Sequence, residues 1–334
     1  MSKRGSSIAF PRGRPASPGH SGGHRLLRGL AIAATATTFL LVVIGALVRA
    51  TGSGLGCTGW PKCSAHRWLP PLEHHAIIEY SHRMTAFVAI VLVGCLAVVA
   101  WRRYRDAPRV LWPSLGAVGL IIMQAVLGGI VVKGDLATLL VTAHFATAMI
   151  LVATLVYVTV SSFSVEAHPP GPPDGLTSLA RLVAAATLAL LIVGAYVRGE
   201  GAGLAFGDWP LMQGRVVPPL HHVGPSVMFA HRVLALAVGI LIGVLAFRAW
   251  RMRDRRPALA ALASVAAVLF LIQVLVGAAL VWSKLSAPAR VAHVAVGTLV
   301  WGALVAVAAV ARLGSSGGPE EPAISAALAK EAVA

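Results

Sequence analysis

The chain has 334 residues, of which 57% are hydrophobic and only 12% are charged, and its mean hydropathy is +0.80. Soluble domains carry about 25% charged residues, so this composition excludes a water-soluble globular enzyme, and the high apolar content also excludes a disordered protein. The formal net charge of +16 does not indicate nucleic-acid binding, because the basic residues are spread over many loops. A protein that crosses the lipid bilayer several times is the class that remains.

Eight apolar runs are each long enough to cross a bilayer as a helix. None of them alternates apolar and polar residues in the way that the strands of a membrane barrel do. We therefore expect an all-α polytopic membrane protein. The predicted spans are residues 29–48, 77–101, 110–132, 136–160, 179–197, 227–250, 258–282 and 291–311.

The basic residues predict the orientation and the ends of the domains. Arginines gather before the first span, after the second and after the sixth, which places both termini on the cytoplasmic side. Residues 1–25 and 313–334 have the small and polar composition of disordered cytoplasmic tails. Residues 162–178 contain a proline-rich run and are predicted to be a cytoplasmic linker between two halves, residues 26–161 and residues 179–312.

An internal repeat relates these two halves. A shift of about 149 positions, without gaps, aligns motifs that are spread over about a hundred residues, which chance similarity between apolar helices does not produce. Each half has four spans, so both halves have the same orientation and their pseudo-twofold axis is expected along the membrane normal. The matched pairs include Gly45 with Gly194, Arg49 with Arg198, Trp60 with Trp209, His82 with His231, Arg83 with Arg232, Gln124 with Gln273, and His144 with His293.

Four of the twelve histidines lie inside spans, namely His82, His144, His231 and His293. Ionisable residues inside a membrane are costly and are usually functional. At about 1.5 Å per residue, His82 and His144 both lie about 7–12 Å inside the outer boundary of their helices. Two imidazoles at equal depth in a four-helix unit suit the two axial positions of one heme iron, and the repeat predicts a second such site. Zinc or copper would usually require further ligands, and no intramembrane cluster of Cys, Asp or Met supplies them.

Arginines accompany the histidines in both halves. Arg49 and Arg198 end the first span of each half, and Arg83 and Arg232 directly follow a histidine. Because Arg pairs strongly with carboxylates, these four residues are candidates for binding heme propionates. The alternative is that they extend to the membrane interface without a ligand.

The two halves also differ. Glu79 precedes His82 by one helical turn, and Cys57 and Cys63 flank Trp60 in the first outer loop. The matching positions of the second half hold Met228, Phe206 and Met212. The cysteines face an oxidising side, so a disulfide is plausible, with a redox-active dithiol or free thiols as alternatives. Glu79 would be an ordinary interfacial carboxylate if it only paired with Arg83, but its absence from the second half suggests one site with an acid–base group and one without.

These motifs resemble those of a known family. Residues 26–312 resemble the heme A synthases of bacterial cytoplasmic membranes and of mitochondria. The resembling stretches are Gly-Ala-Leu-Val-Arg-Ala-Thr-Gly-Ser-Gly-Leu at 45–55, Trp-Pro at 60–61 with its flanking cysteines, Ile-Glu-Tyr-Ser-His-Arg at 78–83, Gln-Ala-Val-Leu-Gly-Gly at 124–129, and the histidines of the fourth, sixth and eighth spans.

The resemblance implies an activity and a division of roles. Heme A synthases oxidise the C8 methyl group of heme O to a formyl group, with oxygen from water, to give heme A for terminal oxidases. By resemblance, the first half accepts heme O between His82 and His144, with Glu79 as its essential acid. The second half would hold heme b between His231 and His293 and pass electrons to an acceptor that the sequence does not name. A heme O synthase or an oxidase assembly factor is the implied partner, in the bacterial cytoplasmic membrane.

Two other functions compete with this interpretation. A bis-histidine cytochrome that only transfers electrons with quinol explains the four histidines equally well, but it does not explain why Glu79 has Met228 as its counterpart. A transporter would also suit a pseudo-symmetric bundle. It predicts broken helices near the midplane, whereas the polar residues here lie near the outer surface.

Overall fold

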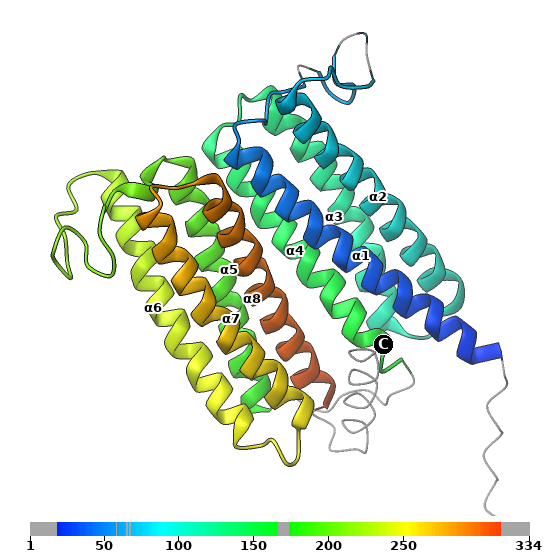
Figure 1. Ribbon diagram of the computed structural model, residues 1–334. Helices are drawn as coiled ribbons and strands as arrows, with labels where there is room; N and C mark the ends of the chain where they lie inside the picture. Colours follow the sequence, from blue (N-terminus) through cyan, green and yellow to red (C-terminus); the bar gives the residue numbers. More distant parts are fainter. Residues whose placement is uncertain (1–18, 58, 65, 67, 166–173, 315–334) are drawn as a thin grey trace, which may run out of the picture.

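The computed structural model describes residues 19–57, 59–64, 66, 68–165 and 174–314, and it confirms all eight predicted spans as α-helices long and apolar enough to cross a membrane (Figure 1). The helices are α1 (Gly19–Ala50), α2 (His74–Arg103), α3 (Pro108–Lys133), α4 (Thr138–Ser162), α5 (Gly175–Gly199), α6 (Val223–Trp250), α7 (Pro257–Trp282) and α8 (Ala287–Leu313), and a short 3-10 helix, η1 (Ala202–Leu204), follows α5.

Most helices extend beyond the apolar runs, since a helix can continue past the hydrocarbon layer, whereas α4 begins at Thr138, slightly after the predicted start at residue 136. Helix α1 begins at Gly19 and α5 at Gly175, inside the stretches expected to be tail and linker. The rest of those stretches, residues 1–18, 166–173 and 315–334, lies outside the described residues, so the disordered tails and the linker remain predictions. Prolines stand in the first turns of α3, α7 and α8, where a missing backbone N–H leaves no bond unmade.

The helices form the two four-helix bundles that the repeat predicts. In the first bundle each of α1 to α4 packs on the next and α4 packs back on α1, and α5 to α8 repeat this ring (Figure 1). The bundles meet where α4 and α8 pack on each other, flanked by α1 on α8 and α5 on α4. Exchanging the two halves leaves this contact pattern unchanged, as a twofold axis between α4 and α8 requires.

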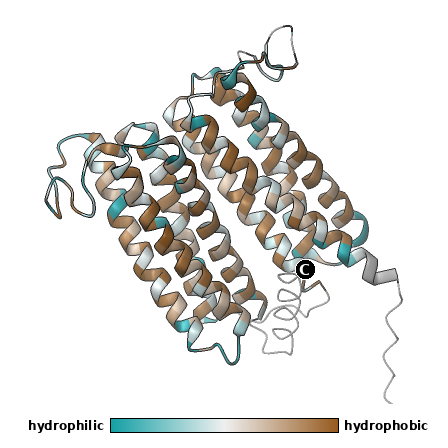
Figure 2. Cartoon of the chain, in the orientation of Figure 1, coloured by the Kyte–Doolittle hydropathy of each residue, from teal (hydrophilic) through white to brown (hydrophobic). Residues whose placement is uncertain are grey.

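Polar residues gather at the two ends of the bundles, and apolar residues cover the lengths of the helices (Figure 2). Large apolar side chains such as Phe87, Leu236 and Leu271 are exposed on the outer surface, as expected for contact with lipid. The loops at residues 51–73 and 200–222 lie at one end, which we call the long-loop end (Figure 1). The protein is therefore a multi-pass membrane protein, and which end faces the cytoplasm remains a prediction.

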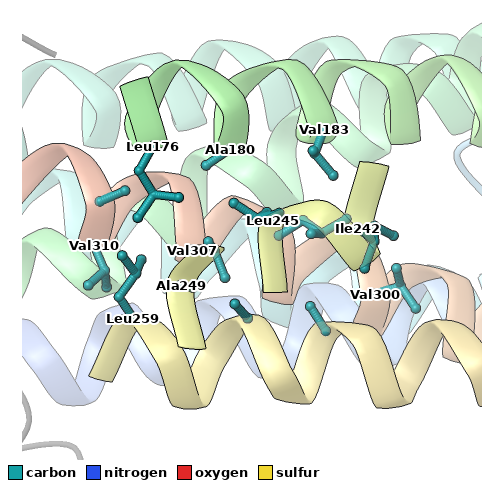
Figure 3. Close-up of a cluster of buried hydrophobic side chains, with 14 of the residues drawn as sticks. Leu176, Ala180, Val183, Ile242, Leu245, Ala249, Leu259, Val300, Val307 and Val310 are labelled. Atoms are coloured by element: carbon teal, nitrogen blue, oxygen red, sulfur yellow. The ribbon is translucent and has the colours of Figure 1, made fainter. Parts of the chain in front are cut away.

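The hydrophobic core of each bundle lies away from the long loops. In the second bundle it joins the start of α5 to the end of α6, the start of α7 and the end of α8, and Figure 3 shows this packing around Leu176, Leu245 and Leu259. The first bundle repeats the arrangement, with Leu27 and Leu96 among its buried residues. Nearer the long loops the second bundle has a separate buried apolar cluster, which includes Phe206, Met212 and Met228.

The junction between the bundles has its own contacts. Trp301 of α8 is buried, and its indole N–H donates to the carbonyl of Met149 on α4, 2.9 Å away. Near the long-loop end, Gly199 lies so close to Thr138 that an added Cβ would stand 2.3 Å from Cγ2 of that threonine. A side chain at position 199 would therefore force α5 away from α4.

Asp174 ties helix ends together at the opposite end of the second bundle. Its carboxylate accepts from the backbone N–H of Thr177 (2.7 Å) and from Nη1 of Arg256 (3.1 Å), and Nη2 of Arg256 also donates to the carbonyl of Ala311 (2.9 Å). Partial burial raises the pKa of Asp174, but the hydrogen bonds from Thr177 and the Arg256 guanidinium lower it more, so the net pKa lies below the ordinary value.

We expect Asp174→Asn to lower the thermal stability of the detergent-solubilised protein at neutral pH, by about 1 kcal/mol or less because the carboxylate is partly exposed. Since its folded-state pKa is depressed, the stabilisation is complete above the ordinary pKa of 3.8 and is lost as the pH falls through the folded-state value. The difference in Tm between wild type and Asp174→Asn should therefore shrink in acid. A difference that is independent of pH would contradict this account.

Candidate functional site

The first histidine pair lies inside the first bundle. His82 of α2 packs against α1 at Gly45, where an added Cβ would stand 3.1 Å from Cε1 of the ring, and His144 of α4 packs against Gly128 of α3 at 3.5 Å. The two rings are close enough to interact electrostatically. In both rings Nδ1 is buried and has no hydrogen-bond partner. The structure thus brings His82 and His144 together in one interior.

The second bundle repeats this arrangement. An added Cβ on Gly194 would stand 3.0 Å from Cε1 of His231, and one on Gly277 would stand 3.4 Å from Cε1 of His293. His231 and His293 also interact electrostatically, and Nδ1 of His231 is buried without a partner. In all four cases a glycine lets the imidazole lie directly against a helix backbone, so the repeat seen in the sequence extends to the packing of the rings.

Two glutamines support these pairs, although their place in the sequence indicated no role beyond the repeat and the family resemblance. Nε2 of Gln124 donates to the carbonyl of His144 at 3.0 Å and also bonds Thr147, and Nε2 of Gln273 donates to the carbonyl of His293 at 3.0 Å. Nε2 of Gln273 also lies 3.3 Å from ring nitrogens of His293. Each glutamine therefore holds the histidine-bearing turn of the neighbouring helix. The sequence feature that could have indicated this role is that both glutamines are polar residues inside predicted spans, at matching positions of the two halves.

The side chains of each interior fit a heme. Nδ1 of His82, His144 and His231 is buried without a hydrogen-bond partner, and a glycine lets each of the four rings lie against a helix backbone. Among the described residues, no three or more His, Cys, Asp or Glu side chains gather as a metal site would require. A pair of imidazoles suits the two axial positions of a heme iron, whereas a closed zinc site would need four ligands.

Glu79 joins the first histidine pair to the loop above it. Its side chain is only 4% exposed, Oε2 accepts from the backbone N–H of Cys57 at 2.8 Å, and Oε1 accepts from Nη2 of Arg83. Arg83 also donates to the loop carbonyls of Gly59 (2.8 Å) and Lys62 (3.1 Å). Glu79 is therefore buried and bonded both to Arg83 and to the backbone of the loop that holds Cys57.

The two loops are built on one plan with different chemistry. Cys57 and Cys63 form a disulfide in the first loop. The positions that match Cys57, Cys63 and Glu79 in the second half are Phe206, Met212 and Met228. These three side chains are buried in one apolar cluster. Arg232 keeps the anchoring role, since it donates to the carbonyls of Asp208 and Leu211, at 3.2 Å and 3.0 Å, which match Gly59 and Lys62. Only the first half therefore combines a histidine pair with an acid and a disulfide.

The four arginines of the sequence interpretation occupy two different settings. The guanidinium groups of Arg83 and Arg232 lie against the loop carbonyls. Arg49 and Arg198, expected to serve one half each, meet at the junction of the bundles, where Nη2 of Arg198 donates to the carbonyl of Arg49 at 2.6 Å. The repeat placed both residues at helix ends, but it did not reveal that the two helix ends meet.

We expect Arg232→Ala to release the loop at residues 200–222, because the substitution removes the donors to two loop carbonyls and leaves both without those bonds. Hydrogen–deuterium exchange should become faster across residues 206–216, while the ends of α6 and α7 at the opposite end keep their protection. The exposed Arg215 of the same loop provides a matched control as Arg215→Ala. Equal exchange in the two variants would show that Arg232 does not anchor the loop.

Comparison with known proteins identifies the family. Residues 28–305 match the family model COX15-CtaA, described as cytochrome oxidase assembly protein. A heme A synthase of Symbiobacterium thermophilum is 32% identical over 298 residues, which cover 84% of this chain and 94% of the relative. A heme A synthase of Halalkalibacterium halodurans is 36% identical over 228 residues, which cover 65% of this chain and 75% of the relative. A heme A synthase of Shouchella clausii is 31% identical over 269 residues, which cover 77% of this chain and 87% of the relative. The chain therefore belongs to the COX15-CtaA family of cytochrome oxidase assembly proteins.

Proposed function

We propose that the protein is a heme A synthase that oxidises the C8 methyl group of heme O to a formyl group. The family and the names of its relatives support heme A synthesis. The observation that carries the assignment to this chain is the asymmetry between two otherwise equivalent sites. One histidine pair has a buried carboxylate beside it, and the other has Met228 at the same position.

The first half is the proposed substrate site. His82 and His144 would hold the iron of heme O, and the glycines beside them let both imidazole rings lie close against the neighbouring helices. Conversion of a methyl to a formyl group with oxygen from water removes four electrons and releases four protons per methyl group. Glu79 is the titratable side chain that the fold buries at the mouth of this interior, so we assign it the acceptance of a proton from the attacking water or the stabilisation of positive charge.

The second half is the proposed electron-transfer site. His231 and His293 would hold heme b, which supplies one-electron transfer when it is bound. The cluster of Phe206, Met212 and Met228 places apolar side chains where the first half has its acid and disulfide. The position that matches Glu79 thereby holds no titratable side chain, which suits a site that passes electrons on without altering its heme.

The remaining polar contacts and partners complete the proposal. Arg49 and Arg198 are the proposed partners of heme propionates. Arg83 and Arg232, whose guanidinium groups engage the loops, are better assigned to anchoring those loops. The bilayer is the cytoplasmic membrane, and a heme O synthase and oxidase assembly factors are the proposed partners for delivery of heme O and release of heme A.

Analysis of extracted hemes tests this function. The full chain is expressed in a host that makes heme O but no heme A, and the hemes are separated by chromatography and identified by mass. We expect heme A, or its hydroxylated intermediate, only in cells that express the protein. Stable heme b with no modified heme under any condition would instead support the bis-histidine cytochrome that only exchanges electrons with quinol.

A further inference from the structure

Three arginines gather at the long-loop end of the junction between the bundles. Arg49 ends α1, Arg198 lies in the last turn of α5, and Arg290 lies in the first turn of α8. Arg198 interacts electrostatically with both of the others and donates to the carbonyl of Arg49. Helix α8 packs directly on α1 and on α5, so three helices from both halves bring the three guanidinium groups to one place.

These three cations have no acidic partner in the part of the chain that the structure describes. The ion pairs there join Arg83 to Glu79, Arg256 to Asp174 and Arg253 to Asp254. Nε of Arg49 and Nε of Arg290 are buried and have no hydrogen-bond partner. A partly buried guanidinium is normally paired, because burial without a counter-charge costs free energy.

The third arginine is not a product of the repeat. The position that matches Arg290 in the first half is Val141, so the cluster consists of one repeat-related pair and one added cation. The three guanidinium groups repel one another, and an anion from outside the chain would relieve this repulsion. Guanidinium groups bind carboxylate and phosphate oxygens through paired hydrogen bonds, which identifies the class of ligand.

We propose that Arg49, Arg198 and Arg290 form one oxyanion-binding site that the two halves share. The oxyanion has two conceivable sources, the propionate carboxylates of a heme or the headgroup phosphate of an anionic lipid. The carboxylate source rests on the proposed function, whereas the lipid source does not. Because α1 and α5 each lead to a different histidine pair, an anion held here contacts both halves at once.

The thermal stability of Arg290→Gln, measured without and with an anionic ligand, tests the site. We expect Arg290→Gln to raise the Tm of the ligand-free full chain in neutral detergent, because it relieves repulsion, and to lower the stabilisation that an anionic ligand confers. Arg290→Lys, which keeps the charge, should retain part of that stabilisation. The matched control is Arg215→Gln, which removes one exposed positive charge at the same end.

Two arms distinguish the sources of the oxyanion. In the first, hemin and its dimethyl ester are titrated into the heme-free chain. A carboxylate source predicts about tenfold tighter binding of the free acid than of the ester in wild type, the equivalent of one charge-assisted hydrogen bond, and loss of that preference in Arg290→Gln.

In the second arm, the Tm of the full chain is compared in nanodiscs of phosphatidylcholine with and without phosphatidylglycerol. A lipid source predicts a rise in Tm with phosphatidylglycerol that Arg290→Gln abolishes and Arg215→Gln does not.

The site is upheld if Arg290→Gln, but not Arg215→Gln, loses either the preference for hemin over its ester or the rise in Tm with phosphatidylglycerol. The response that is lost identifies the ligand. If Arg290→Gln and Arg215→Gln respond equally in both arms, the site is refuted. The heme A measurement is made separately, so a failed carboxylate arm with a positive lipid arm removes only the link to the heme. A failure of heme A formation leaves the lipid arm interpretable.

Discussion

Glu79→Gln is expected to abolish heme A formation while leaving the protein loaded with heme O. The amide retains an oxygen that can accept from the N–H of Cys57, so the contact with the loop is preserved, but it cannot take up a proton. General base catalysis contributes about 10²–10⁴-fold, so we expect a loss of at least about 100-fold in heme A per unit of protein. Chromatography of extracted hemes, normalised to the amount of folded protein, measures this loss.

The control for Glu79→Gln is Glu73→Gln, which removes an exposed carboxylate that precedes the same helix and makes no side-chain capping bond. Glu79→Met, which copies the second half at Met228, should be as inactive as Glu79→Gln and should still fold. If Glu79→Gln forms heme A at a rate close to wild type, Glu79 only holds the loop and the assignment of the acid is wrong.

His231→Ala is expected to remove heme b from the purified protein. The substitution deletes one of two imidazoles in a buried interior, and the remaining His293 cannot supply both axial positions. The absorption bands of six-coordinate heme b should disappear, and heme A formation should fall with them if electrons leave through this half. Visible spectra of the reduced protein measure the first effect.

The matching variant in the other half separates the two sites. His82→Ala should leave the heme b bands in place and remove heme O and heme A from the extract, because its ring faces the interior of the first bundle. Retention of the heme b spectrum in His231→Ala, with its loss in His82→Ala, would reverse the allocation of the two halves.

Much of the architecture followed from the residues alone. A membrane span must satisfy its own backbone hydrogen bonds, so apolar runs of sufficient length could only be helices, and all eight were found. The repeat predicted two bundles, and it predicted that His82 and His144 lie on helices of the same four-helix unit, as α2 and α4 do. Most bounds differed by a few residues, since caps such as Asp174 and prolines at first turns determine where a helix begins, but α1 begins already at Gly19 where residue 29 was predicted.

Other features depend on contacts that no spacing reveals. The sequence placed Glu79 beside Arg83, but only the fold shows that the carboxylate is buried under the disulfide loop and bonded to Cys57. The arginines at the ends of α1 and α5 were expected to serve separate halves, and they meet because α8 packs on both helices. Long-range packing of this kind is decided by the whole junction, which local patterns do not encode.

The proposed function requires that one chain holds two chemically different hemes, one in each bundle. Native mass spectrometry of the full chain, purified from a host that makes heme O, counts and identifies these hemes. We expect one heme b together with one heme O or heme A per chain. A single heme per chain, or two hemes of the same type, would contradict it.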